Sequence, residues 1–181
     1  AVTTALPLVA DRIELPDKGG LLKTEDWISD EFRKRLLDPF GDMKETGDGP
    51  CPRAFNSANR RELLCYLGKR GNRQMVVAFP AREIPRGPKG QNLASGNFAV
   101  AKDDYEDRAI RDRRPKNWIE RAWPQPRLCH ASVFGNLIPK PHQFRRLTIS
   151  DLPYFFHSCG LPRARWIHDP VGPGFTRAEL Q

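Results

Sequence analysis

Two segments of the chain carry residues whose types and spacing suit chemistry on phosphate groups. The first, GNFAVAKDDYEDRAIRDRRPKN at 96–117, places Lys102 and Arg108 beside alternating apolar residues. The second, RRLTISDLPYFF at 145–156, ends an expected strand on Asp151 and continues into aromatic residues. Cations attract phosphates, and a carboxylate is a hard oxygen ligand for a divalent metal ion. Together the two segments predict a site that polymerises nucleotides.

The first segment predicts a β-hairpin. Phe98 and Val100 alternate with small residues over 97–102, which is the period of a strand with unlike faces. A polar turn follows over 103–107, and 108–112 resumes an extended pattern. Lys102 then lies near the end of one arm and Arg108 near the start of the other. We expect the two cations to lie close enough to share one phosphate group.

The second segment predicts a strand that ends on a carboxylate. Leu147, Ile149 and Asp151 fall on one face, because polar residues alternate with them. A carboxylate on an apolar face is costly unless a cation pairs with it, which makes Asp151 a candidate metal ligand. A structural salt bridge or a helix N-cap is the alternative explanation.

Helices and loops are expected around these strands. The spacing of apolar residues predicts a helix over 24–38, and the Gly, Asp, Thr and Pro content of 39–52 predicts a loop. Asn59, with Glu62 three residues later, is typical of the start of a helix. The run 74–79 predicts a strand, and 81–96 predicts a long exposed connection. A boundary near residue 50 divides an acidic helical and linker segment, 1–50, from the remainder, 51–181.

The net charge of +8 is unevenly spread. Residues 1–50 hold 7 basic and 11 acidic side chains, whereas residues 51–181 hold 23 and 11. The basic part is therefore the candidate for contact with phosphates. Ordinary solvated faces are the alternative explanation of the same charges.

The composition indicates a folded intracellular protein, in the nucleus or the cytoplasm. No apolar run approaches the ~20 residues of a membrane span, and no basic leader precedes the N-terminus. The four cysteines form no CxxC pair, which favours free thiols over a zinc site. The chain has no initiator Met, and we expect it to be a fragment.

The spacing of the two segments resembles the fingers and early palm of reverse transcriptases, the RNA-directed DNA polymerases. The shared pattern is Phe-Ala-Val-x-Lys, then Arg-x-Ile-x-Asp-x-Arg-x-x-Asn, then an aspartate at a strand end with an aromatic residue five positions later. It covers roughly residues 60–165 and is most similar to diverged open reading frames of protist retroelements. The matching residues are Phe98, Ala99, Val100, Lys102, Arg108, Ile110, Asp112, Arg114, Asn117, Asp151 and Phe156.

The resemblance implies an α+β fold, a partial right-hand polymerase with a fingers hairpin, the first palm strand and its helix. Members of the family transfer nucleotides with two Mg²⁺ ions. By resemblance, Asp151 is the first catalytic aspartate and a metal ligand, and the carbonyl of Leu152 also reaches a metal. Lys102 and Arg108 match residues that bind the incoming deoxynucleoside triphosphate. Phe156 matches a steric gate that excludes a ribose 2′-hydroxyl.

Other residues of the hairpin invite structural explanations. Asp112 and Arg114 are expected to form a charge pair that braces it. Arg111 and Arg113 could face the phosphates of an RNA or DNA template with its primer, or only water. Residues 102–121 hold seven basic and six acidic side chains, so this segment is not a broad phosphate-binding patch.

The family completes its metal site with a later pair of adjacent aspartates. The only such pair here, Asp103 and Asp104, lies upstream in the expected turn. We therefore expect this chain alone not to polymerise. Two alternatives stay open: a basic module that binds RNA or single-stranded DNA without chemistry, and a retroelement remnant without selected function.

Overall fold

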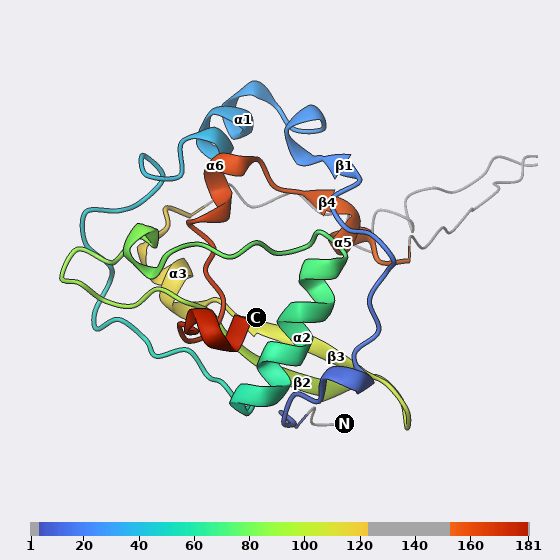
Figure 1. The fold of residues 1–181 in the computed structure, drawn as a ribbon. Helices are drawn as coiled ribbons and strands as arrows, with labels where there is room; N and C mark the ends of the chain where they lie inside the picture. The colour runs from blue at the N-terminus through green and yellow to red at the C-terminus, as the bar shows by residue number, and fades with distance from the viewer. Residues whose placement is uncertain (1–3, 123–152, 181) are drawn as a thin grey trace, which may run out of the picture. The chain divides into compact units, whose positions relative to one another are not determined.

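A computed structural model describes residues 4–122 and 153–180 (Figure 1). The expected α+β class is confirmed at this coarse level, because short helices and strands are mixed along the chain. The chain divides into two compact units, residues 1–121 with 154–181 and residues 122–153. The second unit lies almost wholly outside the described residues. The strands are β1 (Leu22–Lys23), β2 (Gly96–Ala101), β3 (Asp107–Asp112) and β4 (Cys159–Gly160).

The helices of the first unit are short, apart from α2. The α-helices are α1 (Asp30–Leu37), α2 (Arg60–Asn72), α3 (Arg114–Ile119), α5 (Phe155–Ser158) and α6 (Arg163–Trp166). The 3₁₀ helices are η1 (Ala10–Arg12), η2 (Thr24–Asp26), η3 (Ala81–Glu83) and η4 (Arg177–Leu180). Within the described ranges, no helix is long and apolar enough to cross a membrane.

The predicted hairpin is confirmed. β2 and β3 pair antiparallel, with Phe98 opposite Ile110 and Val100 opposite Arg108. The outer edge of β2 is covered by the N-terminal segment, because Leu6 and Ala99 exchange two backbone hydrogen bonds of 2.8 and 3.0 Å. This pairing satisfies main-chain groups that an edge strand would leave open.

Helix α2 begins where the sequence predicts. The side chain of Asn59 accepts a hydrogen bond of 2.9 Å from the backbone N–H of Glu62, as an N-cap should. The Glu62 carboxylate instead accepts the backbone N–H of Ala10 at 2.7 Å. The cap therefore sets the start of the helix, and Glu62 ties it to the N-terminal segment.

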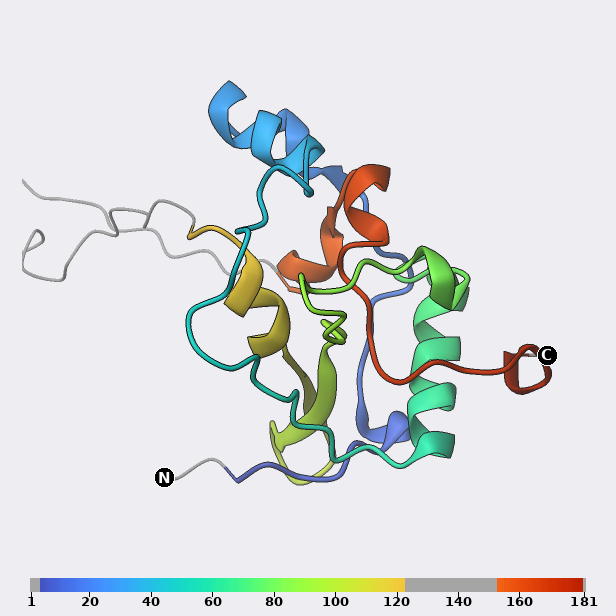
Figure 2. The same ribbon diagram turned by 90° about the vertical axis from the view of Figure 1, so that its left-hand side faces the viewer.

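The core lies between α2 and the hairpin. The N-terminal segment contributes four buried residues to this core: Leu8, Ala10, Ile13 and Leu15. They pack with Leu63 and Tyr66 of α2 and with Ala99 of β2. Figure 2 shows the segment running between α2 on one side and β2 with β3 on the other. Burying a large aliphatic side chain contributes roughly 1.5–3 kcal/mol, so residues 8–15 are integral to the core.

Two predicted elements differ from the structure. The helix expected over 24–38 is divided into η2 and α1, with Ser29 in an extended conformation between them. The strand expected over 74–79 is wrong, since these residues form a turn and irregular chain after α2. Gln74 has a positive φ of 60°, and its N–H bonds the carbonyl of Gly71, so the chain bends back at this point.

A cluster of buried ion pairs joins α1, α3 and α6. Asp42 accepts hydrogen bonds from Arg35 at 2.7 Å and from Arg165 at 3.2 Å. Arg165 also reaches Glu120 at 3.2 Å, just beyond α3. Pairing of this kind offsets the desolvation that isolated buried charges would suffer. The cluster fixes the C-terminal segment against the part of the chain that follows the hairpin.

Candidate functional site

The β2–β3 turn positions the two expected triphosphate-binding cations. The backbone N–H of Lys102 bonds the carbonyl of Glu106 at 2.9 Å and closes the turn. The Asp103 carboxylate accepts the N–H groups of Tyr105 and Glu106, and these bonds hold the pKa of Asp103 below its usual value. Asp103 therefore stabilises the turn.

Lys102 is held between two carboxylates. Its ammonium pairs with Glu106 and lies 3.4 Å from an oxygen of Glu14. The hydrogen bond with Glu106, followed by that with Glu14, raises the pKa of Lys102. Lys102 is thus charged at neutral pH. A phosphate that binds it must compete with both carboxylates.

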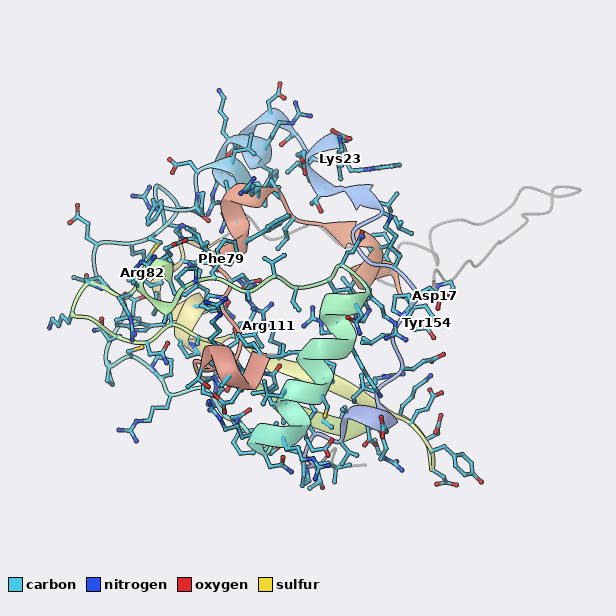
Figure 3. All side chains as sticks on the ribbon, in the orientation of Figure 1. Asp17, Lys23, Phe79, Arg82, Arg111 and Tyr154 are labelled. Atoms are coloured by element: carbon cyan, nitrogen blue, oxygen red, sulfur yellow. The ribbon has the colours of Figure 1, made fainter. Side chains whose placement is uncertain are left out.

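The same carboxylate of Glu14 reaches the segment that follows Asp151. A hydrogen bond with the Tyr154 hydroxyl is the largest cause of a lowered pKa at Glu14, and it raises the pKa of Tyr154. Tyr154, labelled in Figure 3, has a left-handed φ of 54°, which is uncommon for a residue other than glycine. Lys102, which pairs with Glu14, and Tyr154, fifty-two positions later, therefore both influence the same carboxylate.

Phe156 lies close by along the chain, on α5. Its side chain is 87% exposed, and its ring packs edge-to-face on Phe155 at a centroid distance of 5.6 Å. A large aromatic ring with so little packing is available to contact a ligand. The assignment of Phe156 as a gate stays a prediction.

Arg108 is exposed on the side of the hairpin that also carries Phe98 and Ile110. Among the described residues it has no ion-pair partner. The register places it beside an open cavity of about 360 Å³. The cavity is lined by Phe55, Phe98, Ile110, Arg111, Asp112 and Arg114. No sequence pattern predicts that Phe55 lines this cavity, because the residue lies in irregular chain without periodicity.

Asp112 and Arg114 form the expected pair, at 2.7 Å. Asp112 also accepts the backbone N–H of Phe55 at 2.6 Å. These hydrogen bonds, above all those from Arg114, lower the pKa of Asp112 to about 2. Asp112 therefore braces the cavity wall, as predicted for the hairpin.

Arg111 and Arg113 turn toward the C-terminal segment. Arg111, labelled in Figure 3, lies 3.0 Å from the Asp169 carboxylate and donates to the carbonyl of Pro170 at 3.4 Å. Arg113 lies 3.2 Å from Asp169 and 3.4 Å from Glu120. Contact with a template stays a prediction for both residues. In this structure their guanidinium groups pair with carboxylates and so stabilise the packing of the hairpin against the C-terminal segment.

The expected magnesium ligands, Asp151 and the carbonyl of Leu152, lie outside the described residues. Within the described part of the chain, no group of three or more His, Cys, Asp or Glu side chains could hold a metal ion. The carboxylates of Glu14 and Glu106 are instead bound to Lys102. Cys51, Cys65 and Cys159 are free thiols.

The site thus brings together Lys102 of the hairpin turn and Tyr154 of the segment after Asp151, through Glu14. No sequence pattern predicts a role for Glu14, because nothing in its neighbourhood connects it to a residue eighty-eight positions away. No protein-family model, no curated protein and no solved structure matches this chain.

Proposed function

We propose that this chain is the fingers and early palm portion of an RNA-directed DNA polymerase of retroelement type. The activity is the addition of deoxynucleotides to a primer 3′-end, and it belongs to a polypeptide that also supplies the second pair of aspartates. The observation that carries the proposal is the ion pair of Glu14 with Lys102 at 3.4 Å, together with the effect of the Tyr154 hydroxyl in lowering the pKa of Glu14. It supports a site in which the hairpin turn and the residues after Asp151 face one another.

In this proposal the residues have distinct roles. Lys102 and Arg108 offset the charge that builds on the leaving pyrophosphate. Asp151 and the carbonyl of Leu152 would hold Mg²⁺, which would activate the primer hydroxyl and neutralise phosphate charge. The ring of Phe156 lies against the sugar, where a 2′-hydroxyl would clash with it.

A basic module that binds RNA or single-stranded DNA without chemistry is the second candidate. The charge balance of residues 51–181, 23 basic against 11 acidic, favours it. The encoding DNA beyond the codon for Gln181 separates the two. A reading frame that continues into an aromatic-x-Asp-Asp motif favours the polymerase, and a stop codon favours the module or a remnant.

Binding of a deoxynucleoside triphosphate tests the proposal on the chain itself. Isothermal titration calorimetry with dTTP and Mg²⁺ should detect binding that Arg108→Ala weakens by on the order of tenfold, the loss of one charge-assisted contact. Arg163→Ala, which removes another exposed cation, is the matched control and should leave the affinity unchanged. Equal affinity in all three proteins, or no binding at all, would refute the proposal.

A further inference from the structure

Three cations lie on residues 80–92, a stretch of the chain between α2 and β2. Arg82, Arg86 and Lys89 are all exposed, and in the part of the chain that the structure describes none of them has an ion-pair partner. We call residues 80–92 the basic loop. Glu83 is its one acidic residue, so the loop carries a net charge of +2. The fold itself makes no use of these charges.

The tip of the basic loop has a defined backbone. The N–H of Gly87 bonds the carbonyl of Gln91 at 2.9 Å, and the N–H of Gly90 bonds the carbonyl of Gly87 at the same distance. The side chain of Gln91 accepts the N–H of Lys89 at 2.9 Å. Gly90 has a φ of 77°, where a side chain would be strained. These bonds hold Arg86 and Lys89 on an ordered turn.

Most other cations near the hairpin are already paired with carboxylates. The paired ones include Arg12, Lys102, Arg111, Arg113, Arg114 and Lys116. Three like charges on one ordered loop repel one another, and an anionic partner would lower this repulsion. The basic loop is therefore suited to an anionic partner from outside the chain.

The basic loop precedes the end of β2 that is farther from Lys102. It leads through three residues into Gly96, which pairs with Asp112, whereas Lys102 follows the other end of β2. A strand rises about 3.3 Å per residue, so Gly96 and Lys102 are roughly 20 Å apart. Figure 3 likewise shows Arg82 and Tyr154 on opposite sides of the view. One triphosphate cannot contact both the loop and Lys102.

We propose that Arg82, Arg86 and Lys89 bind the phosphodiester backbone of a single-stranded nucleic acid. A polyanion can span the distance between the basic loop and the candidate site, and its phosphates carry the charge that complements exposed cations. The inference extends the proposed function by assigning the contact for the strand that is copied.

The salt dependence of binding tests this role. Fluorescence anisotropy should be measured with labelled poly(U) and poly(dT) oligonucleotides over a series of salt concentrations. Each lost phosphate contact should reduce the slope of log affinity against log salt by about 0.7 for a single strand. The combined Arg82→Gln, Arg86→Gln and Lys89→Gln variant should therefore lose about 2 in slope and on the order of tenfold in affinity.

A matched variant controls for net charge. Lys18, Lys23 and Lys34 are likewise exposed, and no ion pair involves them within the described residues. Changing these three to Gln should leave the slope nearly unchanged. Equal losses in both triple variants would overturn the inference, because the effect would then be one of total charge.

The remaining outcomes separate this inference from the proposed function. Loss of oligonucleotide binding with unchanged dTTP binding supports both. Oligonucleotide binding that keeps its slope in the basic-loop variant overturns the inference alone, and so does an absence of oligonucleotide binding beside normal dTTP binding. A preference for poly(U) or for poly(dT) shows whether the bound strand is RNA or DNA.

Discussion

Glu14 and Lys102 lie 3.4 Å apart, carboxylate oxygen to ammonium nitrogen, although eighty-eight residues separate them in the sequence. The pairing follows from the core. Ile13 and Leu15 are buried on either side of Glu14, which leaves its side chain exposed beside the hairpin turn. Glu14 is therefore fixed as a carboxylate next to a cation that we assign to triphosphate binding.

Removing the charge of Glu14 should strengthen triphosphate binding. In Glu14→Gln, Lys102 keeps only the Glu106 carboxylate, so a phosphate has one competitor fewer. We expect dTTP affinity with Mg²⁺ to rise by about twofold to fivefold, since an exposed ion pair is worth up to about 1 kcal/mol. Calorimetry measures the change, and Glu31→Gln, exposed on α1, is the control. Unchanged or weaker binding in Glu14→Gln would show that Glu14 does not compete.

Asp112 should contribute stability that disappears in acid. Its pKa is about 2 in the folded protein against an ordinary 3.8. The contribution is complete above pH 3.8, and it is lost as the pH falls through that value toward 2. We expect Asp112→Asn to cost about 1–2 kcal/mol at neutral pH. Urea unfolding measures the loss, and the exposed Asp104→Asn should change stability by less than about 0.5 kcal/mol.

His168 should make the protein sensitive to mild acid. The side chain is 1% exposed, and burial, followed by the charges of Lys116 and Arg165, lowers its pKa from 6.5 to about 4. The unfolded chain binds the proton first, so stability is complete above pH 6.5 and falls as the pH drops toward 4. The loss should reach about 2 kcal/mol.

A histidine variant tests this origin of the acid sensitivity. His168→Gln should flatten the dependence of the unfolding free energy on pH between 6.5 and 4. His157→Gln is the matched control, because burial also lowers the pKa of His157 but this residue is less enclosed. A pH profile unchanged by His168→Gln would assign the effect to other groups.

The Phe156→Ala substitution should reduce the selectivity for deoxyribose over ribose without changing the stability of the protein. The ring is 87% exposed, so its removal should change the unfolding free energy by less than about 0.5 kcal/mol. The preference for dTTP over UTP should fall, because the clash with a 2′-hydroxyl disappears. Competition binding measures the ratio. A preference that persists in Phe156→Ala would remove this residue from sugar discrimination.

Local patterns in the sequence were sufficient to predict the hairpin and the start of α2. Alternation over β2 and β3 and the cap at Asn59 act between neighbouring residues, so they can be recognised without knowledge of the fold. The strand expected over 74–79 was wrong for the opposite reason. Apolar composition favours a strand, but the turn at Gln74 and the absence of a pairing partner within the described residues decide the conformation.

The site was predictable only in part. The Asp112 and Arg114 pair follows from short spacing, and Lys102 and Arg108 from the hairpin. Contacts between distant segments, such as Glu14 with Lys102 and Arg111 with Asp169, depend on the packing of the core and leave no mark on the local sequence. Asp151, Leu152 and their magnesium ions remain predictions from the resemblance.

Photocrosslinking can test the proposed polymerase site itself, because it reports where a nucleotide binds. Azido-dUTP should be bound in the presence of Mg²⁺, irradiated, and the labelled peptides identified by mass spectrometry. We expect labelling within 96–117 and 151–158. Excess dTTP should prevent this labelling, and Asp151→Asn or omission of Mg²⁺ should reduce it. Labelling elsewhere, or labelling that neither dTTP nor Asp151→Asn affects, would contradict a polymerase nucleotide site in this chain.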